Sequence, residues 1–137
     1  MAEVVVGILV GSESDRERMQ ACMDELEAQG IGHEFEVRSA HRQPDAVAEY
    51  GRTARERGLR VLIAGAGLAA ALPGVLAAHT DLPVIGVPLR SSKSVLDGLD
   101  ALLSIVQMPP GVPVACVGVD NAKNAAVLAA RILGPSS

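Results

Sequence analysis

Five apolar runs alternate with five segments of helical periodicity along this chain, and this alternation restricts the fold more than any other feature. The runs have the length and continuous apolar character of strands buried on both faces. We expect strands at Val4–Val10, Ile31–Arg38, Leu59–Ala64, Leu82–Pro88 and Val112–Val119. Crossovers that hold a helix join strands in parallel and place helices on both faces. The sequence therefore predicts an α/β fold, a three-layer α/β/α sandwich around a five-stranded parallel sheet.

Glycine, proline and capping residues indicate where the helices begin and end. Ser14 and Glu17 have the spacing of a capping box, so the first helix should begin there. Pro44 and Pro73 suit first helical turns, and Asn121 can cap the last helix. Apolar residues recur three and four positions apart, which predicts the faces that pack on the sheet. These inner faces are Met19, Cys22, Met23 and Leu26, then Val47, Tyr50 and Ala54, then Val95, Leu99, Leu102, Leu103 and Val106, and last Ala125, Leu128, Ala129 and Ile132.

Length, charge and composition exclude several classes of protein. The 137 residues suffice for one domain, 1–137. A net charge of -4 and 1% aromatic residues argue against nucleic acid, which needs positive charge and stacking surfaces. No run approaches the ~18 apolar residues of a membrane-spanning helix, and Met1-Ala2-Glu3 does not begin a signal peptide. Cys22 and Cys116 lack metal-ligand spacing and are typical of reduced thiols, so we expect a cytoplasmic protein without a bound metal.

The loops after the first three strands carry most of the polar chemistry. In a flavodoxin-like strand order, 2-1-3-4-5, these loops converge at the switch point where open α/β sheets bind ligands. They read GSESD, SAHRQPD and AGAG. In the third, Gly65 and Gly67 allow the backbone to approach a ligand closely, or form a tight turn. GSESD alone also fits a capped turn, because it lacks the glycines of a dinucleotide site and the lysine of a P-loop.

An imidazole and a guanidinium stand side by side in the loop after the second strand. Ser39, His41 and Arg42 precede the helix that Pro44 opens, where helix N-termini favour anions. Arginine pairs with phosphate through two parallel hydrogen bonds. An imidazole changes its charge near neutral pH and can act as acid and base. The alternative is a surface loop with an incidental histidine, and the loop by itself leaves both interpretations open.

Taken together, five segments resemble the PurE family, the carboxyaminoimidazole ribonucleotide mutases and carboxylases. They are GSESD, SAHRQPD, AGAGLAAALPG, LDGLDALLSIVQMPPGVPVACV and NAKNAAVLAARIL. The resemblance covers Val4 to Leu133, and the combination of GSxSD, SAHR and SIVQMPxGVPV is highly specific. Arg42, rather than a lysine, resembles the bacterial mutase branch more than the direct carboxylases of animals.

The resemblance implies a flavodoxin-like fold and, usually, a homo-octamer. It implies an enzyme of de novo purine biosynthesis that moves a carboxylate from the exocyclic nitrogen to a ring carbon of aminoimidazole ribonucleotide. The reaction needs neither metal nor cofactor, and an ATP-dependent carboxylase is the expected pathway partner. His41 matches the family's general acid/base. Ser12, Asp15 and Arg42 match its ribonucleotide-binding positions, to which the converging loops add Ser39, Gly65 and Gly67.

Three features depart from the family pattern. Ala71 stands where the family's GAAHLPG carries a site histidine. The usual C-terminal helix, which packs on a neighbouring subunit, is not expected after Leu133. Gln43, where threonine is usual, is a weaker helix cap.

These departures keep two alternatives to the mutase open. One is a divergent paralogue that transfers or removes a carboxylate on another small N-carboxy compound. The other is a non-catalytic nucleotide-binding module, against which His41 argues, because a module does not need the imidazole.

Overall fold

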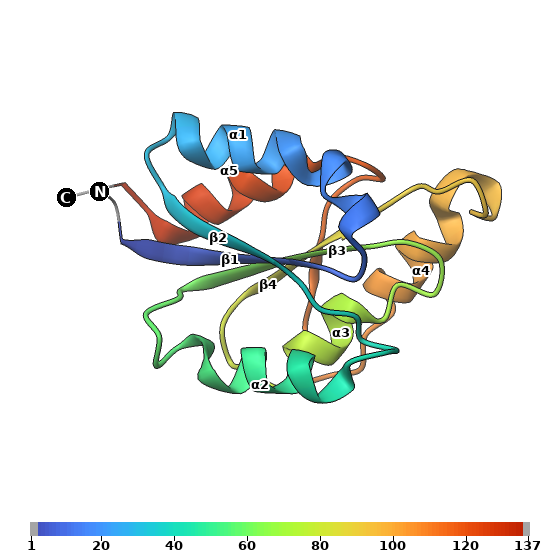
Figure 1. Cartoon of the computed structure of the whole chain (residues 1–137), viewed down its shortest axis with the longest axis horizontal. Coiled ribbons are helices and arrows are strands. Elements are labelled where there is room, and N and C mark those ends of the chain that lie inside the picture. The colour runs from blue at the N-terminus through green and yellow to red at the C-terminus, as the bar shows by residue number, and fades with distance from the viewer. Residues whose placement is uncertain (1–2, 136–137) are drawn as a thin grey trace.

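The computed structural model describes residues 3–135, which form a sheet between two layers of helices (Figure 1). Residues 1–2 and 136–137 lie outside the described residues, and with them the start of the Met1-Ala2-Glu3 segment and both ends of the expected domain. The five parallel strands have the order β2-β1-β3-β4-β5. They are β1 (Val4–Val10), β2 (Gly32–Val37), β3 (Val61–Ala66), β4 (Val84–Pro88) and β5 (Ala115–Cys116). The predicted fold class and strand order are confirmed.

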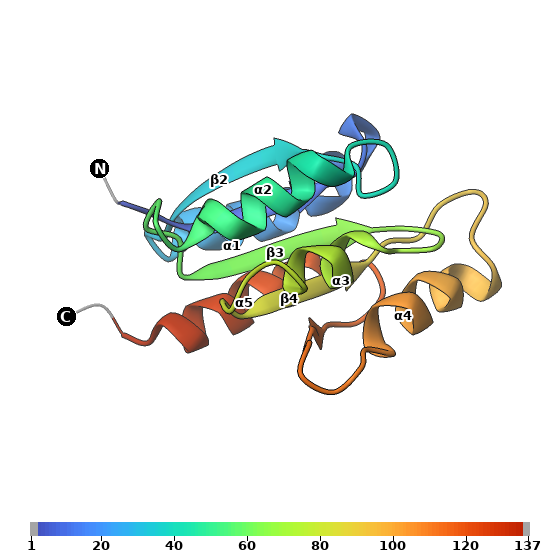
Figure 2. The same ribbon diagram turned by 90° about the horizontal axis from the view of Figure 1, so that it is seen from below.

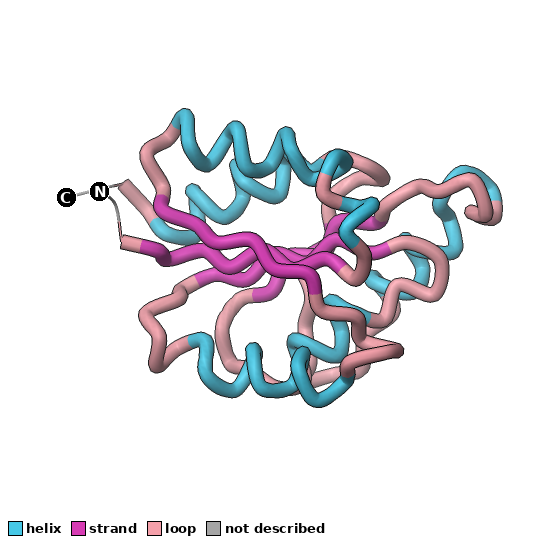
Figure 3. The backbone as a smooth tube through the Cα atoms, in the orientation of Figure 1, coloured by secondary structure: helices cyan, strands magenta, loops and turns pink. Residues whose placement is uncertain are grey.

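The helices divide between the two faces of the sheet, as Figures 1 and 3 show. On one face lie α1 (Gln20–Ala28) and α5 (Ala122–Leu133), packed against each other. On the other face lie α2 (Pro44–Ala54) and α3 (Leu72–Ala77), with α4 (Leu99–Val106) beside β4 and β5. Figure 2 shows α2 and α3 running across this second face. Three short 3-10 turns complete the structure: η1 (Glu13–Asp15), η2 (Glu17–Met19) and η3 (Leu96–Gly98).

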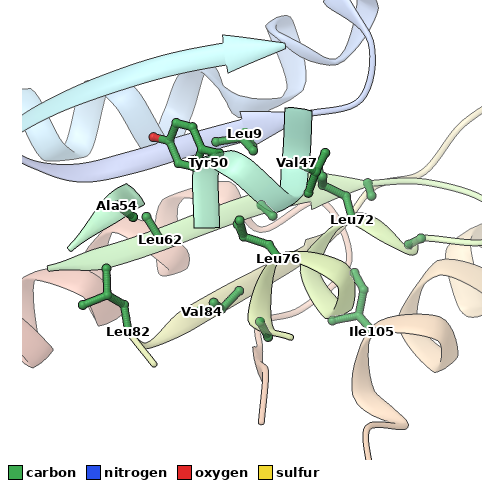
Figure 4. Close-up of a cluster of buried hydrophobic side chains, with 14 of the residues drawn as sticks. Leu9, Val47, Tyr50, Ala54, Leu62, Leu72, Leu76, Leu82, Val84 and Ile105 are labelled. Atoms are coloured by element: carbon green, nitrogen blue, oxygen red, sulfur yellow. The ribbon is translucent and has the colours of Figure 1, made fainter. Parts of the chain in front are cut away.

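The core consists of two apolar clusters, one on each face of the sheet. Successive residues of a strand point to opposite faces, so Ile8 belongs to the cluster under α1 and α5, and Leu9 to the cluster under α2 and α3. Figure 4 shows the second cluster, in which Tyr50 is the one aromatic side chain. Aliphatic side chains and alanine fill both layers, as the near absence of aromatic residues requires.

Gly7 makes room for the Tyr50 side chain where α2 crosses the sheet. A Cβ atom at Gly7 would overlap the Tyr50 hydroxyl oxygen and come within 3.1 Å of a Leu59 methyl carbon. Tyr50 is 1% exposed, and its hydroxyl donates a hydrogen bond of 2.7 Å to Glu34. The ring cannot withdraw from Gly7 without leaving the packed cluster and stretching that bond.

We therefore expect Gly7→Ala to destabilise the fold by about 1–3 kcal/mol, the usual cost of overpacking a core. Gly118→Ala is the matched control, because its added methyl would meet only an ordinary contact of 3.8 Å with Asn121. Urea unfolding of both variants measures the difference. If Gly7→Ala were as stable as the control, the packing of Tyr50 would not require a glycine at position 7.

Four of the five predicted strands have wrong boundaries. The second strand is Gly32–Val37 rather than Ile31–Arg38, and the fourth is Val84–Pro88 rather than Leu82–Pro88. The last strand is limited to Ala115–Cys116 rather than Val112–Val119, because Pro113 has no N–H to donate to the ladder. The third strand is Val61–Ala66 rather than Leu59–Ala64. Leu59 is not part of the strand, because its backbone amide donates to the Ala54 carbonyl at the end of α2. At the other end the strand continues to Ala66, which pairs with β4.

The predicted inner face of α4 is wrong. The helix buries Ala101 and Ile105, and Leu103 and Val106 remain 49% exposed. Ile105 faces the sheet because β4 has a glycine there: a Cβ at Gly86 would come within 2.5 Å of an Ile105 methyl carbon. The apolar periodicity was visible in the sequence, but it does not reveal which of two apolar sides meets the sheet. Val95, Leu96 and Leu99 extend the exposed apolar surface.

The start of the first helix and the inner face of the last also differ from prediction. Ser12, not Ser14, caps the first turn: its side chain accepts a hydrogen bond from the Ser14 amide, and α1 begins only at Gln20. The cap at Asn121 is confirmed. In α5 the buried residues are Ala122, Ala125, Ala126 and Ala129, whereas Leu128 is half-buried and Ile132 is exposed. Small residues face α1 because the two helices pack closely.

Candidate active site

The loops after β1, β2 and β3 meet around a hollow of about 260 Å³ at the carboxyl ends of these strands. It is lined by Gly11, Ser12 and Asp15 from the first loop, Ser39, Ala40, His41 and Arg42 from the second, and residues 66–72 from the third. Figure 1 shows the three loops on the same side of the molecule, away from the chain ends. The structure thus brings together every predicted site residue except Gly65.

Gly65 lies within β3 and faces the core. A Cβ at Gly65 would come within 2.7 Å of the Met19 sulfur and 3.2 Å of a Leu89 methyl carbon. Its missing side chain therefore serves the packing of η2 against the sheet. Gly67 does line the hollow, and there a Cβ would lie 3.0 Å from the Leu89 carbonyl oxygen, so the loop passes close to the end of β4.

The first loop presents a hydroxyl and a carboxyl to the hollow. The Ser12 hydroxyl accepts from the Ser14 amide at 3.3 Å and lies 2.9 Å from the Ser14 hydroxyl. Asp15 is half-buried, and this burial raises the pKa of its carboxyl, against an opposing effect of the Arg18 charge. The loop offers oxygen atoms that can exchange hydrogen bonds with the hydroxyl groups of a ligand.

The second loop is held in shape by hydrogen bonds between its two ends. The Gln43 amide donates to the Ser39 carbonyl at 2.7 Å, and the Gln43 side-chain oxygen accepts from the Ser39 amide at 3.3 Å. The Ser39 hydroxyl accepts from the Arg42 amide at 3.2 Å. Ser39 therefore shapes the loop as well as lining the hollow.

Gln43 is a structural residue of this loop that the sequence did not reveal. It was predicted to be a weaker cap than threonine, and its side chain forms no capping hydrogen bond with α2. It turns back to Ser39 instead. The position directly before Pro44 was the available signal, since a residue there cannot continue the helix backward.

The side chains of His41 and Arg42 are exposed at the rim of the hollow. Within residues 3–135 neither side chain has a hydrogen bond or an ion pair, although Arg42 uses its backbone amide. A guanidinium without an internal carboxylate partner is available to an anion, and an imidazole beside it can exchange protons with a bound molecule.

A roomier hollow of about 610 Å³ lies at the other end of the sheet, between Gln29, Ile31 and α5. Among the described residues that line it, Arg131 is the only charged one, and none is a nucleophile or an acid/base group. The smaller hollow is therefore the better candidate for the active site.

Among residues 3–135 no three His, Cys, Asp or Glu side chains are grouped as metal ligands. None of the helices described combines the length and apolar character needed to cross a membrane.

Comparison with known proteins agrees with the pattern of the three loops. The model of the family described as AIR carboxylase matches residues 5–137. The chain belongs to this family. It is 60% identical over 128 residues to the N5-carboxyaminoimidazole ribonucleotide mutase of Pyrococcus abyssi, covering 93% of this chain and 72% of the relative. The mutase of the same name from Thermotoga maritima is 57% identical over 129 residues, or 94% and 74% of the two chains.

Solved structures of related proteins have the same fold as this member of the AIR carboxylase family. The structure of Treponema denticola PurE superposes with a TM-score of 0.82 at 32% identity, covering 94% of this chain and 79% of that one. The predicted resemblance to the PurE family is therefore confirmed, as is the flavodoxin-like α/β fold.

Ala71 lies in the hollow, at the position where the resemblance predicts a histidine. It is the residue directly before α3, and its amide donates to the Ala69 carbonyl at 2.7 Å. Its neighbours in the lining, Ala69 and Ala70, are equally small. This wall of the hollow therefore offers backbone groups and methyl groups. His41 is the only imidazole among the described residues that line the hollow.

Proposed function

We propose that this protein is an N5-carboxyaminoimidazole ribonucleotide mutase of de novo purine biosynthesis that works without metal or cofactor. The observation that supports this most is the meeting of His41, Arg42 and Asp15 around one hollow at the carboxyl ends of the strands. Relatives that bear this name are 57% and 60% identical over nearly the whole chain. Ligand binding at this edge of the sheet is the rule for open α/β folds.

Arg42 and Ser12 hold the phosphate of the ribonucleotide in this proposal, and Asp15 accepts hydrogen bonds from the ribose hydroxyls. Arg42 suits the phosphate because no internal carboxylate within residues 3–135 engages its guanidinium. Asp15 would repel the phosphate, so the sugar is its place. Ser39 and Gly67 complete the wall against which the ligand lies.

His41 moves the proton in both halves of the reaction. The protonated imidazole donates to the exocyclic nitrogen as the bond between nitrogen and the carboxylate carbon breaks, which releases carbon dioxide. The ring carbon then attacks the carbon dioxide and forms the new carbon–carbon bond. The neutral imidazole, left by the first step, takes the proton from that ring carbon. The atoms and charges balance without a co-reactant, and one group serves as both acid and base.

Carbon dioxide must stay in the site between these two steps, which requires a closed pocket. In one chain the hollow is open at the rim, since His41 and Arg42 are exposed. The exposed apolar side of α4 continues into Val95 and Leu96, which precede the helix and are 59% and 75% exposed, and this is a surface that a second copy of the chain would cover. We propose a homo-oligomer, an octamer by family resemblance.

Light scattering at micromolar concentration should give a mass of several chains, because closed symmetric assembly is the usual way to bury such a surface. Leu96→Glu with Leu103→Glu should shift the mass toward the monomer, since both side chains are exposed and neither supports the core. A monomeric wild-type protein would rule out the oligomer.

The chemistry also implies a supplier of the substrate. The N-carboxylate of a weakly basic aromatic amine loses carbon dioxide readily and forms unfavourably from bicarbonate, so an ATP-dependent carboxylase is the expected pathway partner. A cytoplasmic location is part of the proposal. The free thiols of Cys22 and Cys116 support it.

A substitution at Ala71 distinguishes the proposed mutase from the alternative, a paralogue that acts on a different small N-carboxy compound. A methyl group in place of an imidazole removes a hydrogen-bonding partner and leaves space for one or two waters. We expect Ala71→His to raise mutase kcat/KM at least about tenfold, equivalent to ~1.4 kcal/mol of transition-state stabilisation.

Steady-state kinetics of both proteins on carboxyaminoimidazole ribonucleotide make the comparison. Ala78→His is a control, because Ala78 is exposed at the far end of α3 and lies outside the hollow. Full activity of the wild type, or no gain in Ala71→His, would show that Ala71 is not a weakness of the site. Loss of all binding in Ala71→His would favour the paralogue with a bulkier substrate.

A direct assay tests the proposed function as a whole. The protein is incubated with N5-carboxyaminoimidazole ribonucleotide in one sample, and with aminoimidazole ribonucleotide and bicarbonate in another. Chromatography then separates the carboxylated isomers. Conversion in the first sample supports the mutase, conversion only in the second indicates a direct carboxylase, and conversion in neither overturns the proposal.

A further inference from the structure

Arg38 connects the end of β2 to the first turn of α2, on either side of the loop that carries His41. Its backbone amide donates to the Val10 carbonyl at 2.8 Å, which fixes the residue to the sheet. Its guanidinium nitrogen Nη1 donates to the Ala46 carbonyl at 2.6 Å. The Arg38 side chain therefore links the two ends of the loop 39–43, which are the end of β2 and the first turn of α2.

The guanidinium is itself held from two further sides. Its Nε atom donates to the Glu36 carboxylate at 2.9 Å, and Nη2 lies 2.8 Å from the same oxygen. Its central carbon lies 5.1 Å from the centroid of the Tyr50 ring. Tyr50 is rigidly placed, because it is buried and its hydroxyl is bonded to Glu34. The Arg38 side chain, 26% exposed, thus has little freedom to leave the Ala46 carbonyl.

Among the described residues, the loop has no hydrogen bond to β1 or β3, and its apolar contact with the core is that of Ala40, which packs against the cluster under α2 and α3. Its hydrogen bonds run within the loop, between Ser39, Arg42 and Gln43, and to the first turn of α2, whose Ala46 and Val47 amides donate to the Gln43 carbonyl. These bonds fix its shape but not its place relative to β1 and β3, which contribute the other walls of the hollow. The distance between the end of β2 and the start of α2 sets that place.

We propose that Arg38 is a positioning residue for His41. By tying the first turn of α2 to the end of β2, it sets where the imidazole stands over the hollow. The inference rests on the proposed role of His41 as the proton-transfer group. A small misplacement of such a group is enough to slow a reaction about 100-fold.

Arg57 provides a matched control within the same structure. Its central carbon lies 4.7 Å from the centroid of the same Tyr50 ring, and its Nη1 atom donates to Glu34 at 3.1 Å. Like Arg38, it therefore contacts a glutamate carboxylate and the ring of Tyr50. It follows the end of α2 and has no contact with residues 39–43. Removing it should reduce stability without moving the loop.

The first test compares the kinetics of Arg38→Met, Arg38→Lys and Arg57→Met. We expect Arg38→Met to lower mutase kcat at least about tenfold while KM changes less than threefold. Arg38→Lys should have a kcat between those of Arg38→Met and the wild type. A lysine ammonium can reach the Ala46 carbonyl, but it cannot also form the two guanidinium contacts with the Glu36 carboxylate. Arg57→Met should keep kcat within twofold of wild type. Equal losses of kcat in Arg38→Met and Arg57→Met would overturn the proposal.

The second test does not depend on activity. Amide hydrogen exchange of Ser39, Arg42 and Gln43 is measured in the wild type and the three variants without ligand, since these amides form the bonds inside the loop. We expect exchange at least about tenfold faster in Arg38→Met than in Arg57→Met, because the loop ends separate. If the wild type has no mutase activity, the proposed function fails and this exchange still tests the positioning. If the wild type is active and Arg38→Met matches it in kcat and exchange, the role of Arg38 is wrong.

Discussion

His41→Asn should lower mutase kcat by at least about 100-fold and leave the affinity for the ribonucleotide nearly unchanged. General acid–base catalysis contributes on the order of 10²–10⁴-fold, and asparagine keeps a polar side chain but cannot carry a proton between steps. The imidazole is exposed and has no hydrogen bond within the described residues, so the fold does not depend on it.

Steady-state kinetics and calorimetric titration of His41→Asn measure the two quantities separately. His79→Asn is a suitable control, because His79 is a helix-end residue outside the hollow. Turnover of His41→Asn within a few-fold of the wild type would remove His41 from the mechanism. A matching loss in the affinity for the ribonucleotide would instead make it a binding residue.

Arg42→Ala should weaken a ribonucleotide about 30-fold, and the matching ribonucleoside hardly at all. The loss corresponds to roughly 2 kcal/mol, the scale of a charge-assisted contact to phosphate. Arg52→Ala controls for the loss of one positive charge, since Arg52 is exposed on α2 and lies outside the hollow. Isothermal titration with both ligands makes the comparison. Equal losses for nucleotide and nucleoside would show that Arg42 does not bind the phosphate.

The sheet was predictable because it depends on simple periodic patterns. Val4–Val10 could be recognised as a buried strand from its continuous apolar run, and Pro44 marked the start of α2 correctly. The convergence of the site loops followed from the strand order alone, since parallel strands end at the same edge. This is why the sequence alone predicts that His41, Arg42 and Asp15 lie together.

Contacts between side chains on different elements were not predictable in the same way. Gly65 resembled a ligand-binding glycine, but its role follows from Met19, which reaches it from another segment. The exposed side of α4 depends on Gly86, a residue far away in the chain. Arg38 reads in sequence as a polar strand end, and only the position of the Ala46 carbonyl reveals its contact.

Movement of one carboxylate carbon within the substrate is best followed by isotope labelling. N5-carboxyaminoimidazole ribonucleotide with carbon-13 in its carboxylate is incubated with the protein in unlabelled bicarbonate, and carbon NMR follows the label. A sample without protein corrects for spontaneous loss of the label. We predict that the labelled carbon appears on the ring carbon of the product, because the site retains carbon dioxide between the two steps. A product without label, or no product above the blank, would contradict the mutase.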